Sequence, residues 1–166
     1  MLNQKNPNAW SCLPTAFANV LDLELDRVLF YLGHDGSEIV RAGLPDPLCR
    51  KGFHPHELIR LCLEMQRAVT RYELIGQATP GNTFDPTVFD FGGWPPFITQ
   101  MYNSLGVLDV RTSMGVGHAM SYRGNGDHAE ICDPANGEVF EFSDPADTEK
   151  HGRFITALWR IDRINI

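Results

Sequence analysis

The sequence predicts an α+β fold in which N-terminal helices pack on a C-terminal antiparallel β-sheet. Apolar residues recur at helical spacing in the first 66 residues, whereas the last third of the chain alternates apolar and polar residues. Two glycine-containing segments, Gly124-Asn125-Gly126 and Asn136-Gly137, separate the alternating stretches as hairpin turns do. A block of helices followed by a block of strands is typical of α+β proteins. We expect the 166 residues to form one domain, with a helical part at about 11–66 and a sheet part at about 106–162.

Three helices are expected in the helical part. The first covers residues 12–21, because Ser11 is a good N-cap and Pro14 falls in the first turn, where its missing N–H costs nothing. The second and third cover residues 25–32 and 55–66, each with apolar residues on one face.

The strands are expected where short apolar or alternating segments lie between turn signals. These segments are residues 68–75, 106–112, 117–122, 128–132, 139–142 and 155–161. The stretch from 76 to 96 is broken by glycine and proline but rich in aromatic residues, so it predicts an ordered loop over the core. A short helix at about 96–104 is expected to follow it.

The bulk properties exclude some function classes. A formal net charge of −7 argues against a nucleic-acid partner, which would require a basic face. The first ten residues do not resemble a signal peptide, and no apolar run approaches the ~20 residues that span a bilayer. We therefore expect a cytoplasmic protein with no membrane association, whose four cysteines are free thiols.

Three residues in chain order predict a cysteine nucleophile site: Cys12, His118 and Asp133. A thiol at a helix N-terminus is favoured as the reactive anion by the helix dipole and the unpaired N–H groups. His118 begins one strand and Asp133 ends the next, so the hairpin between them brings the two side chains together. The carboxylate can then orient the imidazole, whose other nitrogen faces the thiol. Whether Cys12 meets this pair depends on the sheet packing against the first helix.

Such a site also needs donors for an oxyanion formed on a bound carbonyl. The Cys12 backbone N–H is the first donor, and the second is expected from an amide side chain upstream. Asn6 is the first choice, with Gln4 and Asn8 as alternatives. Trp10, Trp94 and Gly117 are the candidates for residues that line a substrate cleft.

The polar residues allow two other readings. His128 could replace His118 as the base, but it begins its strand at the hairpin turn, far from Asp133. A zinc site would have the spacing Cys-x4-His-x-His-x5-Cys, which matches no familiar zinc motif. Its ligands would be Cys49, His54, His56 and Cys62. We expect no metal and no cofactor.

At these positions the chain resembles papain-like cysteine peptidases, and specifically the small branch similar to bacteriocin-processing leader peptidases (peptidase C39-like). Members of that branch resemble residues 12–21 in having a nucleophile that opens a helix of small and apolar residues. They also resemble Gly117-His118 and Asp133-Pro134 in the strand that begins with Gly-His and the partner strand that ends with Asp-Pro. The order of cysteine, histidine and aspartate is shared with transglutaminase-like folds.

The resemblance implies Cys12 as nucleophile, His118 as general base and acid, and Asp133 as the residue that orients it. Two positions depart from the pattern. The family's oxyanion donor is a glutamine about six residues before the cysteine, where this chain has Asn6, and its Cys-Gly pair is Cys12-Leu13 here.

We therefore predict a peptidase or amide hydrolase that acts on a peptide or protein substrate through a thioester on Cys12. The alternative is a catalytically silent protein on the same scaffold. Such a chain, encoded by a phage or mobile element, would bind and modulate a host protein.

Overall fold

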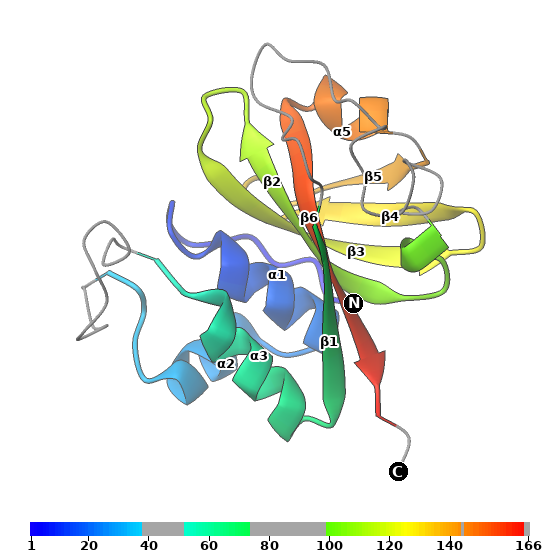
Figure 1. The fold of residues 1–166 in the computed structure, drawn as a ribbon. Helices are drawn as coiled ribbons and strands as arrows, with labels where there is room; N and C mark the ends of the chain where they lie inside the picture. Colours follow the sequence, from blue (N-terminus) through cyan, green and yellow to red (C-terminus); the bar gives the residue numbers. More distant parts are fainter. Residues whose placement is uncertain (38–51, 74–98, 144, 165–166) are drawn as a thin grey trace.

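The computed structural model describes residues 1–37, 52–73, 99–143 and 145–164. Three helices, α1 (Cys12–Leu21), α2 (Leu25–Leu32) and α3 (Pro55–Glu64), lie together against one side of a β-sheet (Figure 1). The helices contact each other, α1 packs on the centre of the sheet, and α3 packs on its edge. The predicted α+β arrangement of helices on an antiparallel sheet is confirmed.

The sheet has six antiparallel strands in the order β1-β6-β2-β3-β4-β5. Their bounds are β1 (Arg67–Glu73), β2 (Leu105–Thr112), β3 (Gly117–Asn125), β4 (His128–Asp133), β5 (Glu138–Phe142) and β6 (Arg153–Arg163). The last strand, β6, pairs with β1 on one side and with β2 on the other. It therefore connects β1, which follows the helices, to the strands β2 to β5 in one sheet. A short helix that the sequence pattern did not indicate, α5 (Pro145–Lys150), precedes β6.

The turn between β3 and β4 lies later in the chain than the sequence predicts. Strand β3 continues to Asn125, and the turn is formed by Gly126 and Asp127. Gly124 lies within the strand, at a point where any side chain would collide with the carbonyl group of Met101. Its N–H donates to the Ser104 carbonyl oxygen at 2.8 Å. This glycine therefore serves a close approach of two backbone segments rather than a turn.

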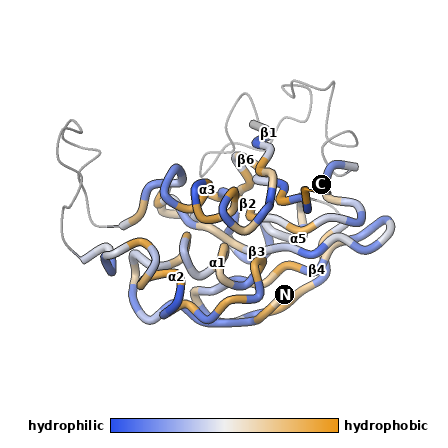
Figure 2. The backbone as a smooth tube through the Cα atoms, turned by 90° about the horizontal axis from the view of Figure 1, so that it is seen from below, coloured by the Kyte–Doolittle hydropathy of each residue, from blue (hydrophilic) through white to orange (hydrophobic). Residues whose placement is uncertain are grey.

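The sheet has a hydrophobic cluster on each face. The cluster between the helices and the sheet includes Phe17, Val28 and Leu58 from the helices and Val107 and Trp159 from the strands. The cluster on the other face is formed mainly by strand residues, such as Leu108, Met120, Tyr122, Ile131 and Leu158. The central strands β2, β3 and β6 each contain three or four consecutive buried residues, as a sheet buried on both faces requires at its centre. In Figure 2, segments coloured as hydrophobic occur in the strands as well as in the helices. The sheet thus separates two cores.

Helix α1 is buried along most of its length, from Pro14 to Leu21, including the polar residues Thr15 and Asn19. It begins at Cys12 as predicted, with Ser11 at the N-cap position. The Ser11 side chain does not cap the helix, however, because its hydroxyl contacts the Asn8 side-chain oxygen at 2.7 Å. Thr15 instead donates to the Ser11 carbonyl oxygen through both its N–H and its hydroxyl.

Several expectations fall on residues outside the described ranges. These are the aromatic loop from 76 to 96 with Trp94, residue Cys49 of the rejected zinc set, and the start of the short helix near residue 96. Residues 99–101 are helical. Among the described helices, none has the length and apolar character needed to cross a membrane.

Candidate active site

His118 and Asp133 lie together at one end of the β3–β4 hairpin. His118 Nε2 is 2.6 Å from Asp133 Oδ1, and both side chains are nearly buried, with 9% and 3% of their surface exposed. The two residues come from the first position of β3 after Gly117 and the last position of β4. The hairpin geometry therefore brings together the two residues for which the sequence predicted proximity.

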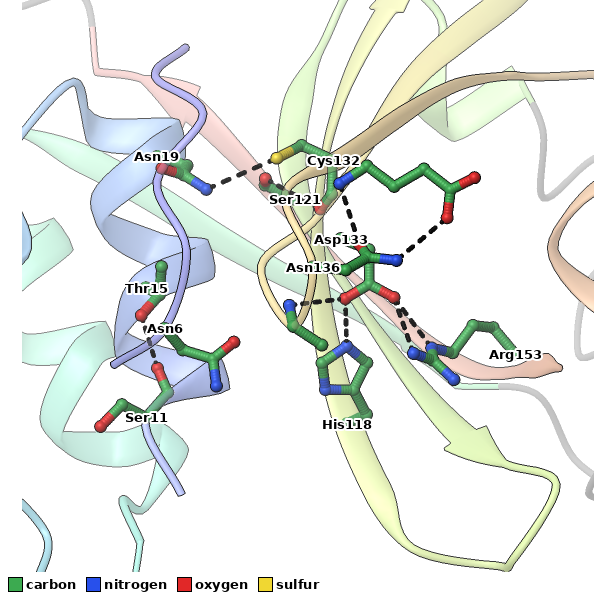
Figure 3. Close-up of polar contacts among 12 residues, drawn as sticks. Asn6, Ser11, Thr15, Asn19, His118, Ser121, Cys132, Asp133, Asn136 and Arg153 are labelled. Atoms are coloured by element: carbon green, nitrogen blue, oxygen red, sulfur yellow. Dashed lines mark hydrogen bonds and ion pairs between the residues drawn. The ribbon is translucent and has the colours of Figure 1, made fainter. Parts of the chain in front are cut away.

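The Asp133 carboxylate is held by three groups. Oδ1 accepts from His118 and from the Ala135 backbone N–H at 2.8 Å. Oδ2 accepts from Nε and from one terminal nitrogen of Arg153, each at 2.9 Å. Figure 3 shows the carboxylate between the imidazole and the guanidinium group. With both oxygens engaged, the carboxylate has a fixed orientation towards the imidazole.

These contacts determine the charge states of the pair. Burial alone would lower the pKa of His118, but its hydrogen bonds to Asp133 and Cys12 and the negative charges of both raise that pKa from 6.5 to about 9. Burial works to raise the pKa of Asp133, yet the hydrogen bond and charge of His118, the Ala135 N–H and the charge of Arg153 bring it below its usual range. At neutral pH the site therefore holds an imidazolium beside a carboxylate.

Cys12 lies at the first position of α1. Its side chain forms a hydrogen bond with His118, which is one of the causes of the raised pKa of the histidine. Since Nε2 faces Asp133, Nδ1 is the ring nitrogen left for the sulfur, and it points away from the carboxylate in Figure 3. Helix α1 packs on β3, which is how the first helix and the hairpin come together. Cys12, His118 and Asp133 thus form one connected cluster.

Asn6 lies beside this cluster, because its backbone N–H donates to the Pro134 carbonyl oxygen at 2.8 Å. Its side-chain nitrogen donates to the carbonyl oxygen of Asn8, and its side-chain oxygen is buried without a hydrogen-bond partner. The amide is therefore near the site but turned towards its own chain segment. To reach an oxyanion it would have to rotate away from Asn8.

The two alternative amide donors have other roles. The Gln4 side chain donates to the Leu23 carbonyl oxygen at 2.8 Å and accepts from the Leu25 N–H at 2.9 Å, so it joins the N-terminal segment to the start of α2. The oxygen of Asn8 accepts from the Trp10 N–H at 3.1 Å and contacts the Ser11 hydroxyl. Gln4 thus has a structural role between the N-terminal segment and α2, and the Asn8 oxygen stabilises the turn before α1.

The remaining sequence candidates lie as follows. The Trp10 indole N–H donates to the Asp35 carbonyl oxygen at 3.0 Å, which links the segment before Cys12 to the segment that follows α2. Gly117 is exposed at the start of β3, and a side chain at its position would meet open space. His128 is at the far end of the hairpin, paired with the exposed Asp127 at 3.2 Å. It is not part of the cluster around Asp133.

The three described residues of the zinc set, His54, His56 and Cys62, do not converge. His54 is the N-cap of α3, where it forms a reciprocal capping box with Glu57, and its ring stacks on that of His56. Cys62 faces the core, fully buried, and burial raises its pKa to about 12. Within the described residues, no three histidine, cysteine or acidic side chains are grouped to hold a metal ion.

Sequence reasoning missed two polar residues, one that binds Asp133 and one that is buried in α1 and contacts the neighbouring Cys132. Arg153, at the start of β6, binds Asp133. Asn19 is fully buried in α1. Its side-chain oxygen accepts from the Gln4 backbone N–H, and its side-chain nitrogen lies 3.8 Å from the Cys132 sulfur. A buried asparagine in an otherwise apolar helix is a signal that a sequence can give. Arg153 gives none, because arginine at a strand end is common on protein surfaces.

The comparisons with known proteins bear on the fold. No protein-family model matches the chain, and no curated protein matches its sequence. Among solved structures it is similar to the peptidase domain of Streptococcus ComA, a bifunctional ABC transporter involved in a quorum-sensing pathway. The TM-score is 0.57 and the identity 11%, with 96% of each chain covered. The chain therefore has the papain-like α+β fold of that peptidase domain, as the resemblance seen in the sequence predicted.

Proposed function

We propose that this protein is a papain-like cysteine peptidase or amide hydrolase that uses Cys12, His118 and Asp133. The observation that carries the proposal is the hydrogen-bonded connection from Cys12 through His118 to a buried Asp133. Support also comes from the fold that the chain shares with the ComA peptidase domain.

The proposed reaction begins with a thiolate on Cys12 and a proton on His118. A pKa of about 9 keeps His118 protonated at neutral pH, which matches a negatively charged sulfur beside it. The sulfur attacks the carbonyl carbon of the scissile amide, and the carbonyl oxygen becomes an oxyanion. His118 Nδ1–H then gives its proton to the leaving amine as the C–N bond breaks, which leaves a thioester.

The second half of the reaction returns the thiolate. His118, now neutral, takes a proton from water, and the hydroxide oxygen attacks the thioester carbonyl. The C–S bond breaks, the acid product leaves, and His118 retains the proton that pairs it with the thiolate. In both halves the oxyanion would be stabilised by the Cys12 backbone N–H at the start of α1 and by the Asn6 amide after its rotation.

The substrate class we propose is a peptide or protein, processed in the cytoplasm. The amide bond and its flanking residues would enter at the exposed side of Gly117 and the half-exposed Cys12 and Trp10.

The test is alkylation of each cysteine by iodoacetamide between pH 5 and 9, followed by peptide mass spectrometry. We expect Cys12 to react at least ~10-fold faster at pH 6 than N-acetylcysteine, because the helix N-terminus and the protonated His118 beside it would stabilise the reactive anion. Cys62 and Cys132 serve as internal controls, since both are buried and burial raises the pKa of each. A Cys12 rate equal to that of the model thiol across this range would refute the proposal.

Activity is tested with a proteome-derived peptide library and the Cys12→Ser variant. New peptide termini should appear with the wild type and vanish with the variant. Termini that persist with Cys12→Ser would show that the cleavage does not come from this site.

A second candidate, a non-enzymatic protein that binds a host protein, is favoured by one observation. The Asn6 amide donates to the Asn8 carbonyl oxygen and is not presented to a substrate. Affinity capture with the wild type and Cys12→Ala separates the two candidates. Equal capture of one partner by both proteins, with no cleavage by the wild type, would favour binding.

A further inference from the structure

We infer that Arg153 is a positioning residue of the site, which holds Asp133 so that the imidazole of His118 faces Cys12. This role rests on the proposed cysteine chemistry. Nε and a terminal nitrogen of Arg153 both lie 2.9 Å from Asp133 Oδ2, and His118 Nε2 lies 2.6 Å from Oδ1. The guanidinium and the imidazole therefore hold opposite oxygens of one carboxylate.

The Arg153 contact spans the sheet. Arg153 begins β6, and Asp133 ends β4, with β2 and β3 between them in the strand order. Three strand spacings of about 4.8 Å would exceed the reach of an arginine across a flat sheet. Figure 1 shows β6 and β4 running in strongly different directions, and this twist of the sheet allows the contact. It connects β6 to the hairpin that carries both His118 and Asp133.

A second acidic residue close to Asp133 is held by other side chains and does not compete for Arg153. Glu138 pairs with Asp133 in the β4–β5 register, so it is a second carboxylate next to Asp133. Its carboxylate is instead engaged by His151 at 3.2 Å and by the Asn136 side chain at 3.1 Å. Arg153 is thereby left to Asp133, and its side chain is only 20% exposed.

Two consequences follow for the chemistry. A carboxylate free to rotate would let the imidazole turn, and misplacement of a reacting group by about 1 Å can cost ~100-fold in rate. In addition, the positive charge of Arg153 offsets part of the Asp133 charge that acts on His118. Without Arg153, the pKa of both His118 and Asp133 should rise.

The experiment compares wild type with Arg153→Gln and Arg153→Lys. We expect Arg153→Gln to slow alkylation of Cys12 at pH 6.5 at least ~10-fold. We also expect it to move the pH profile of Cys12 alkylation upwards by about one unit. Arg153→Lys keeps the positive charge but loses the planar guanidinium that forms two hydrogen bonds to one carboxylate. It should therefore restore the pH position of the alkylation profile but not the full alkylation rate of the wild type.

The matched control is Arg160→Gln. Arg160 lies on the same strand and forms a comparable pair with Asp162, at 2.8 Å, away from the site. Thermal unfolding of each variant shows whether it is folded at the assay temperature. The NMR titration of His118 in folded Arg153→Lys provides a second measurement if Arg153→Gln does not fold.

The outcomes separate this role from the proposed function. If wild-type Cys12 reacts like a free thiol, the proposed function fails, and with it the role of Arg153. If wild-type Cys12 is activated and its profile is unchanged in both Arg153 variants, Arg153 is merely a structural link and the inference is overturned. A shift in Arg153→Gln that Arg153→Lys reverses supports it.

Discussion

Asn6 is the residue whose contribution to the site depends most on a local rearrangement. Its backbone is tied to Pro134, next to Asp133, so the residue is fixed beside the cluster. Its amide nitrogen is occupied by the Asn8 carbonyl group and its oxygen is buried without a partner. A buried amide oxygen without a donor is energetically costly, which would favour a change in the side-chain contacts if a substrate carbonyl bound here, as the proposed function requires.

We expect Asn6→Ala to lower kcat by about 10²–10³-fold with little change in KM, as loss of one oxyanion donor does. Asn6→Gln, whose longer arm matches the glutamine of the peptidases that the sequence resembles, should retain at least ~10-fold more activity than Asn6→Ala. Steady-state kinetics on a peptide cleaved by the wild type measures both. The control is Asn125→Ala, an exposed asparagine at the end of β3. Full activity of Asn6→Ala would assign the second donor to another residue.

At the residue scale, sequence reasoning succeeded where a local element fixed the geometry. His118 and Asp133 flank one hairpin, so their proximity follows from the turn between them. The N-terminal position of Cys12 follows from the helix pattern. Arg153 could not be predicted, because its contact with Asp133 depends on the curvature of the sheet across three strand steps. A pattern of alternating residues specifies strands but not that curvature.

At the scale of single elements, α3 shows how one helix face is fixed to the core. Leu58 is fully buried in the cluster between helices and sheet, whereas Leu63 on the same helix is 55% exposed. We expect Leu58→Ala to lower the free energy of unfolding by about 2–5 kcal/mol, because it leaves a cavity. Leu63→Ala should change it by less than about 1 kcal/mol. Urea unfolding measures both, and equal losses would mean that α3 is not seated as described.

Element boundaries were predicted less well than element identities. The third helix ends at Glu64 rather than at the expected Gln66, because Gln66 has a left-handed backbone conformation that a helix does not contain. Strand β3 runs past its expected end. Gly124 read as a turn signal in the sequence, but the structure uses it for contact with the segment around Met101. That segment is remote in sequence from the hairpin, so the role of the glycine required the tertiary structure.

At the scale of the whole molecule, the site makes stability depend on pH. The pKa of His118 is raised to about 9, so its contribution is complete below about 6.5 and is lost as the pH rises through 9. The pKa of Asp133 is lowered, so its contribution is present above about 4 and is lost as the pH falls through the lowered value. Between about pH 4 and 6.5 both groups stabilise the fold fully.

We expect the difference in unfolding free energy between wild type and His118→Gln to shrink by on the order of 3 kcal/mol between pH 6 and 10, at about 1.4 kcal/mol per pKa unit. Urea unfolding of both proteins at pH 6, 8 and 10 measures it. Taking the difference removes the titration of groups that both proteins share. A difference that stays constant over this range would contradict the raised pKa of His118.

The division of the site between the two layers has a consequence for how its activity responds to the rest of the chain. The Cys12 sulfur is carried by α1, whereas His118 and Asp133 are carried by strands β3 and β4. The apolar contacts of α1 with β2 and β3 set the distance between the sulfur and these two residues. Under the proposed function, the reactivity of Cys12 would therefore depend on how closely the helices pack on the sheet. Any ligand or sequence change that slides one layer over the other would alter this chemistry without touching the three polar groups.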